Sequence, residues 1–253
     1  MSTTVVVTGG GRGIGRATAL AFAEPGVHVV VTGRTVWQLD KTAADIHERG
    51  AQATALPMDV TDEASVAHAF GTLHGRVRQV DVLVNNASVG GGEPVQGSDI
   101  ARWTRIIDTN LTGMYLVTRQ LLPLMVAGGR IVNMSSVLGR FGVAGYTAYC
   151  ASKHGVIGFT RALALEVVER GITVNAICPG WVDTDMSVEG MTHGAAATGV
   201  SFDEFKRRAL DAVPIKRIIE PQEVAALVRH LASPAAGAIT GQTYNIDGGQ
   251  TMD

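Results

Sequence analysis

The sequence predicts an α/β protein built on a doubly wound, seven-stranded parallel sheet with helices on both faces. Short, nearly continuous apolar runs alternate with longer stretches of helical periodicity, and this alternation is typical of βαβ units. A glycine-rich turn directly follows the first apolar run and opens a helix. The length of 253 residues suits one large domain better than two. We therefore expect a single domain over residues 1–253.

Composition and charge exclude several other classes of protein. Hydrophobic residues make up 46% and charged residues 17%, the formal net charge is -2, and no long basic run suggests a nucleic-acid partner. No apolar stretch reaches membrane-spanning length and the start MSTTVVVTGG does not resemble a secretion signal, so we expect a soluble cytoplasmic protein without membrane contact. The two cysteines and seven histidines lack metal-ligand spacing, so no metal site is expected.

The first strand, Thr3 to Val7, leads into the turn TGGGRGIG and an Ala-rich helix. Gly9, Gly13 and Gly15 have the spacing G-x-x-x-G-x-G, which permits a tight turn and a close approach of backbone to a pyrophosphate. The helix start adds free N–H groups and the positive end of the helix dipole. Together these features predict a dinucleotide-binding Rossmann fold.

The second strand, residues 27–34, ends where such a fold carries its ribose-reading residue. An NAD site would place Asp or Glu there, but Gly33 and Arg34 occupy the position. Arg34 can pair with a 2′-phosphate, and Arg12 in the glycine turn is a second candidate cation. Although each arginine on its own could be a solvated loop charge, the pair without a carboxylate favours NADP(H) over NAD(H).

The remaining elements continue the alternation of strand and helix. We expect helical patterns at 37–50 and 62–75, two helical runs within 101–127, and strands at 51–60, 80–88, 129–136, 173–180 and 241–249. Asp59, after the third strand, could hold an adenine amino group or be a simple loop aspartate. Asn110, where the two helical runs meet, is unfavourable in mid-helix and suggests a kink or a bound water.

The segment between Pro179 and Pro221 is weakly patterned and rich in Gly and Ala. Only residues 203–213 read as a helix within it. A long segment of this kind fits a mobile lid over a substrate cleft, which we place at about 183–215.

A candidate proton donor lies in SVLGRFGVAGYTAYCASK, residues 136–153. If the segment from Tyr149 onward is helical, Tyr149 and Lys153 are i and i+4 neighbours on one face. A cation so placed is expected to lower the phenol pKa and let Tyr149 exchange a proton with an alcohol or carbonyl oxygen. Ser136, at the end of a strand, could hydrogen-bond the same oxygen. The pair alone could equally be two surface neighbours.

Taken together, these motifs resemble the short-chain dehydrogenase/reductase family over essentially the whole chain. The glycine turn, the NNA after the fourth strand, Asn110, Ser136, YxxxK and PGWVDT occur in the family's order. The resemblance implies that Tyr149 is the general acid, that Lys153 lowers its pKa and holds the nicotinamide ribose, that Ser136 steadies the carbonyl oxygen, and that Asn110 anchors a proton-relaying water. It also implies that Thr184 contacts the nicotinamide carboxamide. The candidate cofactor-binding residues are Gly9, Gly11, Arg12, Gly13, Ile14, Gly15, Arg34, Thr35, Asp59, Val60, Asn86, Ala87, Tyr149, Lys153, Pro179, Gly180, Val182 and Thr184.

Within the family the chain is most similar to the NADPH-dependent ketoreductases of bacterial aromatic polyketide pathways, including the actinorhodin and angucycline types. ASKHGVIGFTRALALE, the triplet Gly90 to Gly92 and VPIKRIIEPQEVA carry this likeness, although fatty-acid type 3-oxoacyl reductases share much of it. One departure is Ser88, where the family usually has glycine. Tyr146 is expected to line the cleft or simply to pack. The candidate substrate-lining residues are Ser88, Gly90, Gly91, Val137, Val143, Tyr146, Trp181, Met186 and Met191.

The resemblance implies a ketone substrate, either a free polycyclic compound or one bound to an acyl carrier protein. An alcohol or sugar dehydrogenase working in the oxidative direction is the alternative enzyme, and a nucleotide-binding protein without catalysis is the alternative from another class. Helices around Leu111 to Val126 and Gly155 to Val168 are apolar on more than one face, and the resemblance implies that a homotetramer buries them.

Overall fold

The computed structural model describes residues 3–73 and 77–252, which form one seven-stranded sheet in the order β3-β2-β1-β4-β5-β6-β7. Every neighbouring pair of strands is parallel, which confirms the predicted fold class. The strands are β1 Thr3–Thr8, β2 Val27–Gly33, β3 Gln52–Pro57, β4 Val80–Asn85, β5 Met125–Met134, β6 Thr173–Pro179 and β7 Thr243–Ile246.

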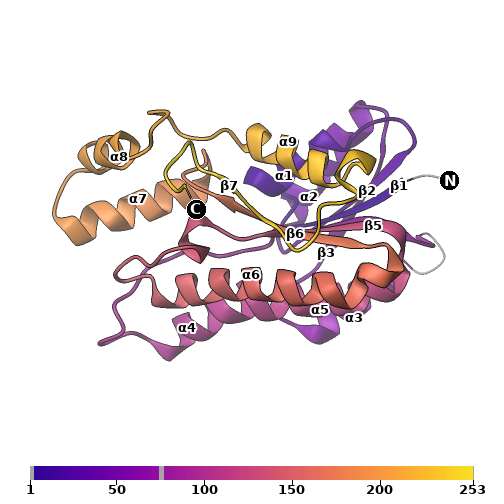
Figure 1. Ribbon diagram of the computed structural model, residues 1–253, viewed down its shortest axis with the longest axis horizontal. Coiled ribbons are helices and arrows are strands. Elements are labelled where there is room, and N and C mark those ends of the chain that lie inside the picture. Colours follow the sequence, from indigo (N-terminus) through magenta and orange to yellow (C-terminus); the bar gives the residue numbers. More distant parts are fainter. Residues whose placement is uncertain (1–2, 74–76, 253) are drawn as a thin grey trace.

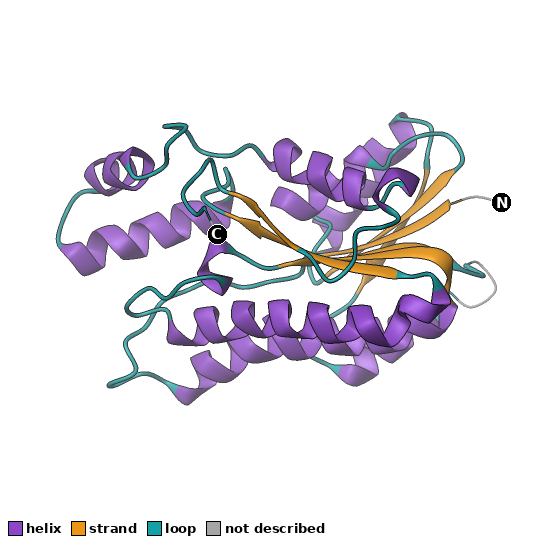
Figure 2. Cartoon of the chain, in the orientation of Figure 1, coloured by secondary structure: helices purple, strands orange, loops and turns teal. Residues whose placement is uncertain are grey.

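Two layers of helices cover the sheet (Figures 1 and 2). One layer consists of α1 Gly13–Ala21, α2 Val36–Glu48 and α9 Pro221–Leu231, and the other of α3 Glu63–Gly71, α4 Ile100–Ile107, α5 Gly113–Leu121 and α6 Thr147–Val167. Successive side chains of a strand point to opposite faces, so Val5 and Val7 pack under the first layer while Val6 packs under the second. The nearly continuous apolar strands of the sequence are buried on both faces for this reason.

The second helical run of the segment 101–127 is shorter than predicted. Helix α5 ends at Leu121, a 3-10 turn spans Leu122–Leu124, and β5 begins at Met125. Pro123 explains the early end, because its ring lacks an N–H and clashes with the preceding turn of a helix. Helix α3 likewise stops at Gly71, and the last predicted positions of that helix, His74 and Gly75, lie outside the described residues.

The weakly patterned segment after β6 contains two helices rather than one. Helix α8 Phe202–Asp211 matches the predicted stretch, whereas α7 Asp185–Thr198 was not predicted. Caps define α7: the Thr184 side chain accepts from the Ser187 amide, and Gly199 ends the helix at φ 67°. Figure 1 shows α7 and α8 beyond the end of the sheet where the strands finish, so they stand over the edge at which ligands bind in this fold class.

Polar side chains tie the centre of the sheet to its helices. Asn85 Nδ2 donates to Thr118 Oγ1 at 3.0 Å and to Asn133 Oδ1 at 2.9 Å, and Asn133 Nδ2 donates to Thr160 Oγ1 at 2.9 Å. All four residues are buried, so each hydrogen bond satisfies groups that water cannot reach. The chain of bonds fixes β4 and β5 against α5 and α6.

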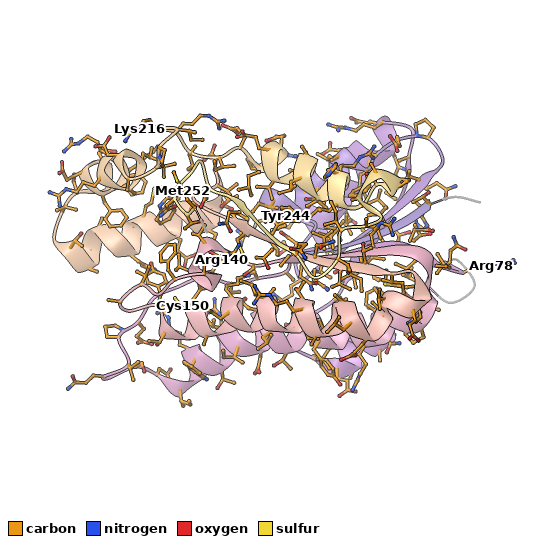
Figure 3. The ribbon with its side chains drawn as sticks, in the orientation of Figure 1. Arg78, Arg140, Cys150, Lys216, Tyr244 and Met252 are labelled. Atoms are coloured by element: carbon orange, nitrogen blue, oxygen red, sulfur yellow. The ribbon has the colours of Figure 1, made fainter. Side chains whose placement is uncertain are left out.

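A second polar contact closes the edge of the sheet. Arg140, which follows β5, donates to Asn245 Oδ1 and to the Thr243 carbonyl of β7, both at 3.2 Å (Figure 3). This arginine therefore joins the short edge strand to the loop that leads into α6. Among the described helices, none has the length and apolarity needed to cross a bilayer.

Candidate active site

A groove of about 310 Å³ lies along the carboxyl ends of β1, β2, β3 and β4. Its floor is the glycine turn between β1 and α1, and its far wall is the start of α7. The turn needs glycine for two reasons, the positive φ angles of its backbone and the close packing of α1. Gly9 and Gly13 have φ of 65° and 51°, and a Cβ on Gly15 would lie 2.1 Å from the carbonyl oxygen of Gly9. Only a glycine at position 15 lets α1 pack this closely on the turn.

The start of α1 provides donors for a pyrophosphate. No side chain caps the helix and no acidic residue lies in its first turn, so its first amides are free for an anion. The glycine turn has a backbone that other residues could not adopt. Together with this turn, the free N–H groups of α1 fit the pyrophosphate of a bound dinucleotide.

The two arginines predicted to read a 2′-phosphate both border the groove. Arg34 Nη1 lies 3.9 Å from Asp59 Oδ2, and Arg12 Nη1 lies 3.0 Å from Asp185 Oδ2 at the start of α7. All four side chains are more than a third exposed, so these pairs are weak and an incoming phosphate can compete for the guanidinium groups. Asp59 is further held by Thr61, whose amide and hydroxyl both donate to Oδ1.

The groove gathers most of the predicted cofactor-binding residues. Those in its lining are Gly9, Gly11, Arg12, Gly13, Ile14, Arg34, Thr35, Asp59, Val60, Asn86, Ala87 and Thr184. Gly15 supports it from behind, whereas the remaining predicted residues, Tyr149, Lys153, Pro179, Gly180 and Val182, do not line it. Sequence reasoning missed Gln38, Leu39, Met58, Thr109 and Asp185, which no motif marks.

Asn110 lies in a π-helical turn, Asp108–Thr112, that separates α4 from α5. The kink expected at this asparagine therefore takes the form of a π-turn, a feature that often occurs at functional sites. Its side chain is 3% exposed, and each of its four hydrogen-bonding positions has a protein partner. Because the side chain is saturated, a water at this residue would have to bind its backbone carbonyl.

Tyr149 and Lys153 lie one turn apart in α6, and Lys153 Nζ is 5.6 Å from the centre of the Tyr149 ring. Lys153 is 2% exposed and donates to the Met134 carbonyl oxygen at 3.0 Å. Ser136 follows β5, and its hydroxyl lies near enough to the phenol to oppose the rise of the Tyr149 pKa. The end of β5 and the first turns of α6 thus bring these three groups together, and Ser135 anchors them through its hydrogen bond to the Lys153 carbonyl at 2.9 Å.

The expected lowering of the phenol pKa does not occur in this structure. Burial raises the pKa of Tyr149 to about 12, outweighing the opposite influence of the Ser136 hydroxyl, and burial lowers the pKa of Lys153 to about 8. Part of the Tyr149 side chain keeps contact with solvent. At neutral pH the phenol holds its proton and the lysine remains mostly an ammonium.

The predicted substrate-lining residues divide into accessible and buried groups. Ser88 and Met186 border the groove, Gly90 lies against Met186, and the Tyr146 ring lies against Gly92 and is half-buried. Gly91, Val143 and Trp181 also keep some exposure. Val137 and Met191 are 4% and 1% exposed, so in this structure they are packed below the surface and do not form an accessible wall.

Within residues 3–73 and 77–252, no cluster of three or more His, Cys, Asp or Glu side chains has the arrangement of a metal site. Cys150, adjacent to Tyr149 in α6, is a free thiol (Figure 3).

The fold, the glycine turn and the Ser136, Tyr149 and Lys153 constellation define an oxidoreductase of the kind that interconverts carbonyl and hydroxyl groups, and the chain belongs to the short-chain dehydrogenase/reductase family. The family model that matches residues 9–251 is described as enoyl-(acyl carrier protein) reductase. The chain is 40% identical to a 3-oxoacyl-[acyl-carrier-protein] reductase of Synechocystis, covering 98% of this chain and 96% of the relative. It is also 40% identical to a putative ketoacyl reductase of Streptomyces coelicolor, with 98% and 97% covered.

Solved structures agree with these relatives. A phenylalanine-to-tryptophan variant of actinorhodin polyketide ketoreductase with NADPH superposes with a TM-score of 0.93 at 39% identity, covering 98% of this chain and 97% of that one. Levodione reductase superposes with a TM-score of 0.91 at 32% identity and the same coverage. These findings confirm the resemblance to polyketide ketoreductases that the sequence motifs indicated.

Proposed function

We propose that this protein is an NADPH-dependent ketoreductase that reduces a ketone of a polyketide-type substrate. The observation that carries the proposal is the protonated Tyr149 phenol, next to a buried ammonium, at the sheet edge where the glycine turn opens a dinucleotide groove. A phenol with a raised pKa is protonated at neutral pH, which is the form that can give a proton to a carbonyl oxygen. The pair of arginines at the groove supports NADPH as the cofactor, and with it reduction rather than the oxidative reaction of an alcohol or sugar dehydrogenase.

The residues divide the work between holding the cofactor and handling the proton. The start of α1 would bind the pyrophosphate, and Arg12 and Arg34 would pair with the 2′-phosphate of NADPH. When bound, NADPH supplies the hydride. Tyr149 donates its proton to the substrate oxygen, Ser136 hydrogen-bonds that oxygen as charge develops, and the Lys153 ammonium stabilises the phenolate left behind. Asn110 holds the π-turn beside them.

The substrate class rests on similarity and on the position of α7 and α8. The actinorhodin enzyme and the Streptomyces coelicolor relative support a polyketide substrate, either polycyclic or attached to an acyl carrier protein. The Synechocystis relative supports a second candidate function, reduction of a 3-oxoacyl group on an acyl carrier protein. In both cases residues 183–215 act as the lid of a single catalytic domain, since α7 borders the groove through Asp185 and Met186.

We further propose a homotetramer working in the cytoplasm. Apolar side chains remain exposed on the outer face of the second helix layer, with Tyr115 46% and Leu165 79% exposed. Burial against other subunits would remove them from water. A single monomeric species in sedimentation velocity would contradict this assembly.

The test is NADPH oxidation by the purified protein in the presence of a decalone, a generic bicyclic ketone. Wild-type protein should turn over and Tyr149→Phe should not, while both bind NADPH with the same Kd. Ketone reduction by the phenylalanine variant at the wild-type rate would refute the assignment of the proton donor. A strong preference for a carrier-bound 3-oxoacyl chain over the decalone would instead select the second candidate function. If the protein binds NADPH but turns over neither substrate, the result would support the alternative of a nucleotide-binding protein without catalysis.

A further inference from the structure

Ser88 occupies the turn after β4, at a position where the family pattern predicts glycine. Its hydroxyl donates to Asn110 Oδ1 at 3.1 Å, and the Val89 amide donates to the same oxygen at 2.8 Å. A carboxamide oxygen has two lone pairs, so these two donors fill it. A glycine at position 88 would leave the oxygen with the Val89 amide alone.

The opposite side of the Asn110 carboxamide reaches the catalytic helix. Asn110 Nδ2 donates to the Val89 carbonyl at 3.0 Å and to Ser152 Oγ at 3.1 Å, and the Ser152 hydroxyl donates to the Tyr149 carbonyl at 2.8 Å. A continuous series of hydrogen bonds therefore runs from Ser88 through Asn110 and Ser152 to the backbone of Tyr149. It crosses three separate segments of the chain: the turn after β4, the π-turn and the first turns of α6.

The central residues of this series of hydrogen bonds are shielded from solvent. Asn110 and Ser152 are 3% and 0% exposed, so neither can replace a lost partner with bulk water. Two donors on Oδ1 hold the carboxamide in the orientation that directs Nδ2 toward Ser152. Ser88 itself borders the groove together with Ala87, and thus lies where the cofactor site and the catalytic helix approach each other.

We propose that Ser88 is a positioning residue for the ketone reduction assigned above, on which this inference rests. Its hydroxyl fixes Asn110, and through Asn110 and Ser152 it sets the position of Tyr149 relative to the groove. Ser88 has one proton and gives it to Asn110, so it acts through that residue and not as a proton donor to the substrate.

The test compares Ser88→Ala and Ser88→Thr with a matched control, Ser98→Ala. Ser98 lies in the same connection between β4 and α4, and its exposed hydroxyl donates to the Val95 carbonyl at 2.9 Å, away from Asn110. We expect Ser88→Ala to lower kcat about fivefold, the effect of one neutral hydrogen bond on a rate. The KM for NADPH should change less than about twofold, because the cofactor contacts remain.

A second measurement separates positioning from a general loss of stability. With NADPH deuterated at the transferred hydrogen, Ser88→Ala should show a larger isotope effect on kcat than wild type, because misplacement slows the chemical step. A reduced fraction of folded protein would lower kcat without changing the isotope effect. Ser88→Thr keeps the hydroxyl and should therefore retain most of the wild-type kcat. Ser98→Ala should match wild type in both kcat and the isotope effect.

Two kinetic results would overturn the proposal. One is a Ser88→Ala enzyme with wild-type kcat and isotope effect, and the other is a rise in KM with unchanged kcat, which would indicate direct contact with a ligand. If wild-type protein reduces no ketone, the proposed function fails, and hydrogen exchange of the peptide over 145–155 still tests the connection. That exchange should be faster in Ser88→Ala than in Ser98→Ala, and equal rates would refute the link to α6.

Discussion

Replacing Lys153 with methionine should make the folded protein more stable at neutral pH while abolishing turnover. The ammonium is 2% exposed, with the Met134 carbonyl as its hydrogen-bond acceptor, so most of its hydration is lost on folding. Methionine has a similar length and no charge to desolvate. The variant therefore separates what the lysine costs the fold from what it contributes to the reaction.

The magnitude follows from the pKa of Lys153, which burial lowers from 10.5 to about 8. At 1.36 kcal/mol per pH unit, burial of the ammonium costs about 3 kcal/mol at pH 7. Losing the hydrogen bond to Met134 offsets about 1 kcal/mol of this, which leaves a net stabilisation of about 2 kcal/mol. For a chain of this size that gain raises the Tm by about 4 to 8 °C.

The sign of the pH dependence follows from the same values. The folded state binds the lysine proton less tightly than the unfolded state, so the cost is fully present below pH 8 and disappears as the pH rises toward 10.5. Wild type should therefore gain about 1 kcal/mol relative to Lys153→Met between pH 7 and pH 9. Taking the difference between the two proteins cancels the other titrating groups.

The assay is urea unfolding without NADPH at one fixed protein concentration, at pH 7 and pH 9. Lys206→Met is the matched control, because Lys206 is an exposed lysine of α8. The control should have wild-type stability at both pH values. The reasoning would be refuted if Lys153→Met were less stable than wild type at pH 7. It would also be refuted if the difference in unfolding free energy between the two proteins were the same at pH 7 and pH 9.

Three further predictions concern the cofactor groove and the core. Arg34→Ala should raise the KM for NADPH by about 10-fold or more and leave that for NADH unchanged, since only a 2′-phosphate loses a charged partner; equal effects on both would exclude this role. Gly15→Ala should weaken NADPH binding in titrations by more than about 10-fold, because its Cβ would overlap the Gly9 carbonyl. The control Gly71→Ala, whose Cβ would meet open space, should bind normally. Asn133→Ala should cost about 2 to 4 kcal/mol in urea unfolding, because it leaves buried partners on β4 and α6 unsatisfied; a cost below about 1 kcal/mol would contradict this account.

The sheet was predictable because its strands carry strong local signals. Apolar runs such as Val5 to Val7 are buried on both faces, and the glycines of the first turn are required by backbone geometry that no other residue tolerates. Helix α7 was missed because it lacks an apolar stripe of helical period and contains Gly190 and Gly194. Its caps and the packing of Gly194 against Phe205 of α8 stabilise it, and such contacts have no period in the sequence.

Many residues of the candidate site were predictable from the sequence, but the electrostatics of the site were not. The spacing of Tyr149 and Lys153 predicts that they share one face of a helix, but it does not reveal how much water each side chain loses. Desolvation acts in opposite directions on a phenol and an ammonium, and it depends on the whole of the surrounding fold. The hydrogen bond of Ser88 to Asn110 joins residues 22 positions apart, for which the sequence offers no periodic signal.

The two shifted pKa values leave both side chains protonated at neutral pH. A protonated phenol is the form needed to give a proton to a carbonyl that is becoming an alcohol, and the reverse reaction starts from the phenolate. Lys153 stays mostly an ammonium at pH 7, so its charge is in place when the phenolate forms. The energetic cost of burying that ammonium in the free protein is thus offset at the moment of proton transfer, when the charge acquires an anionic partner in a medium of low dielectric. The buried charge of Lys153 therefore both destabilises the fold and speeds the reaction. Lys153→Met, which removes the charge, should stabilise the protein and abolish turnover.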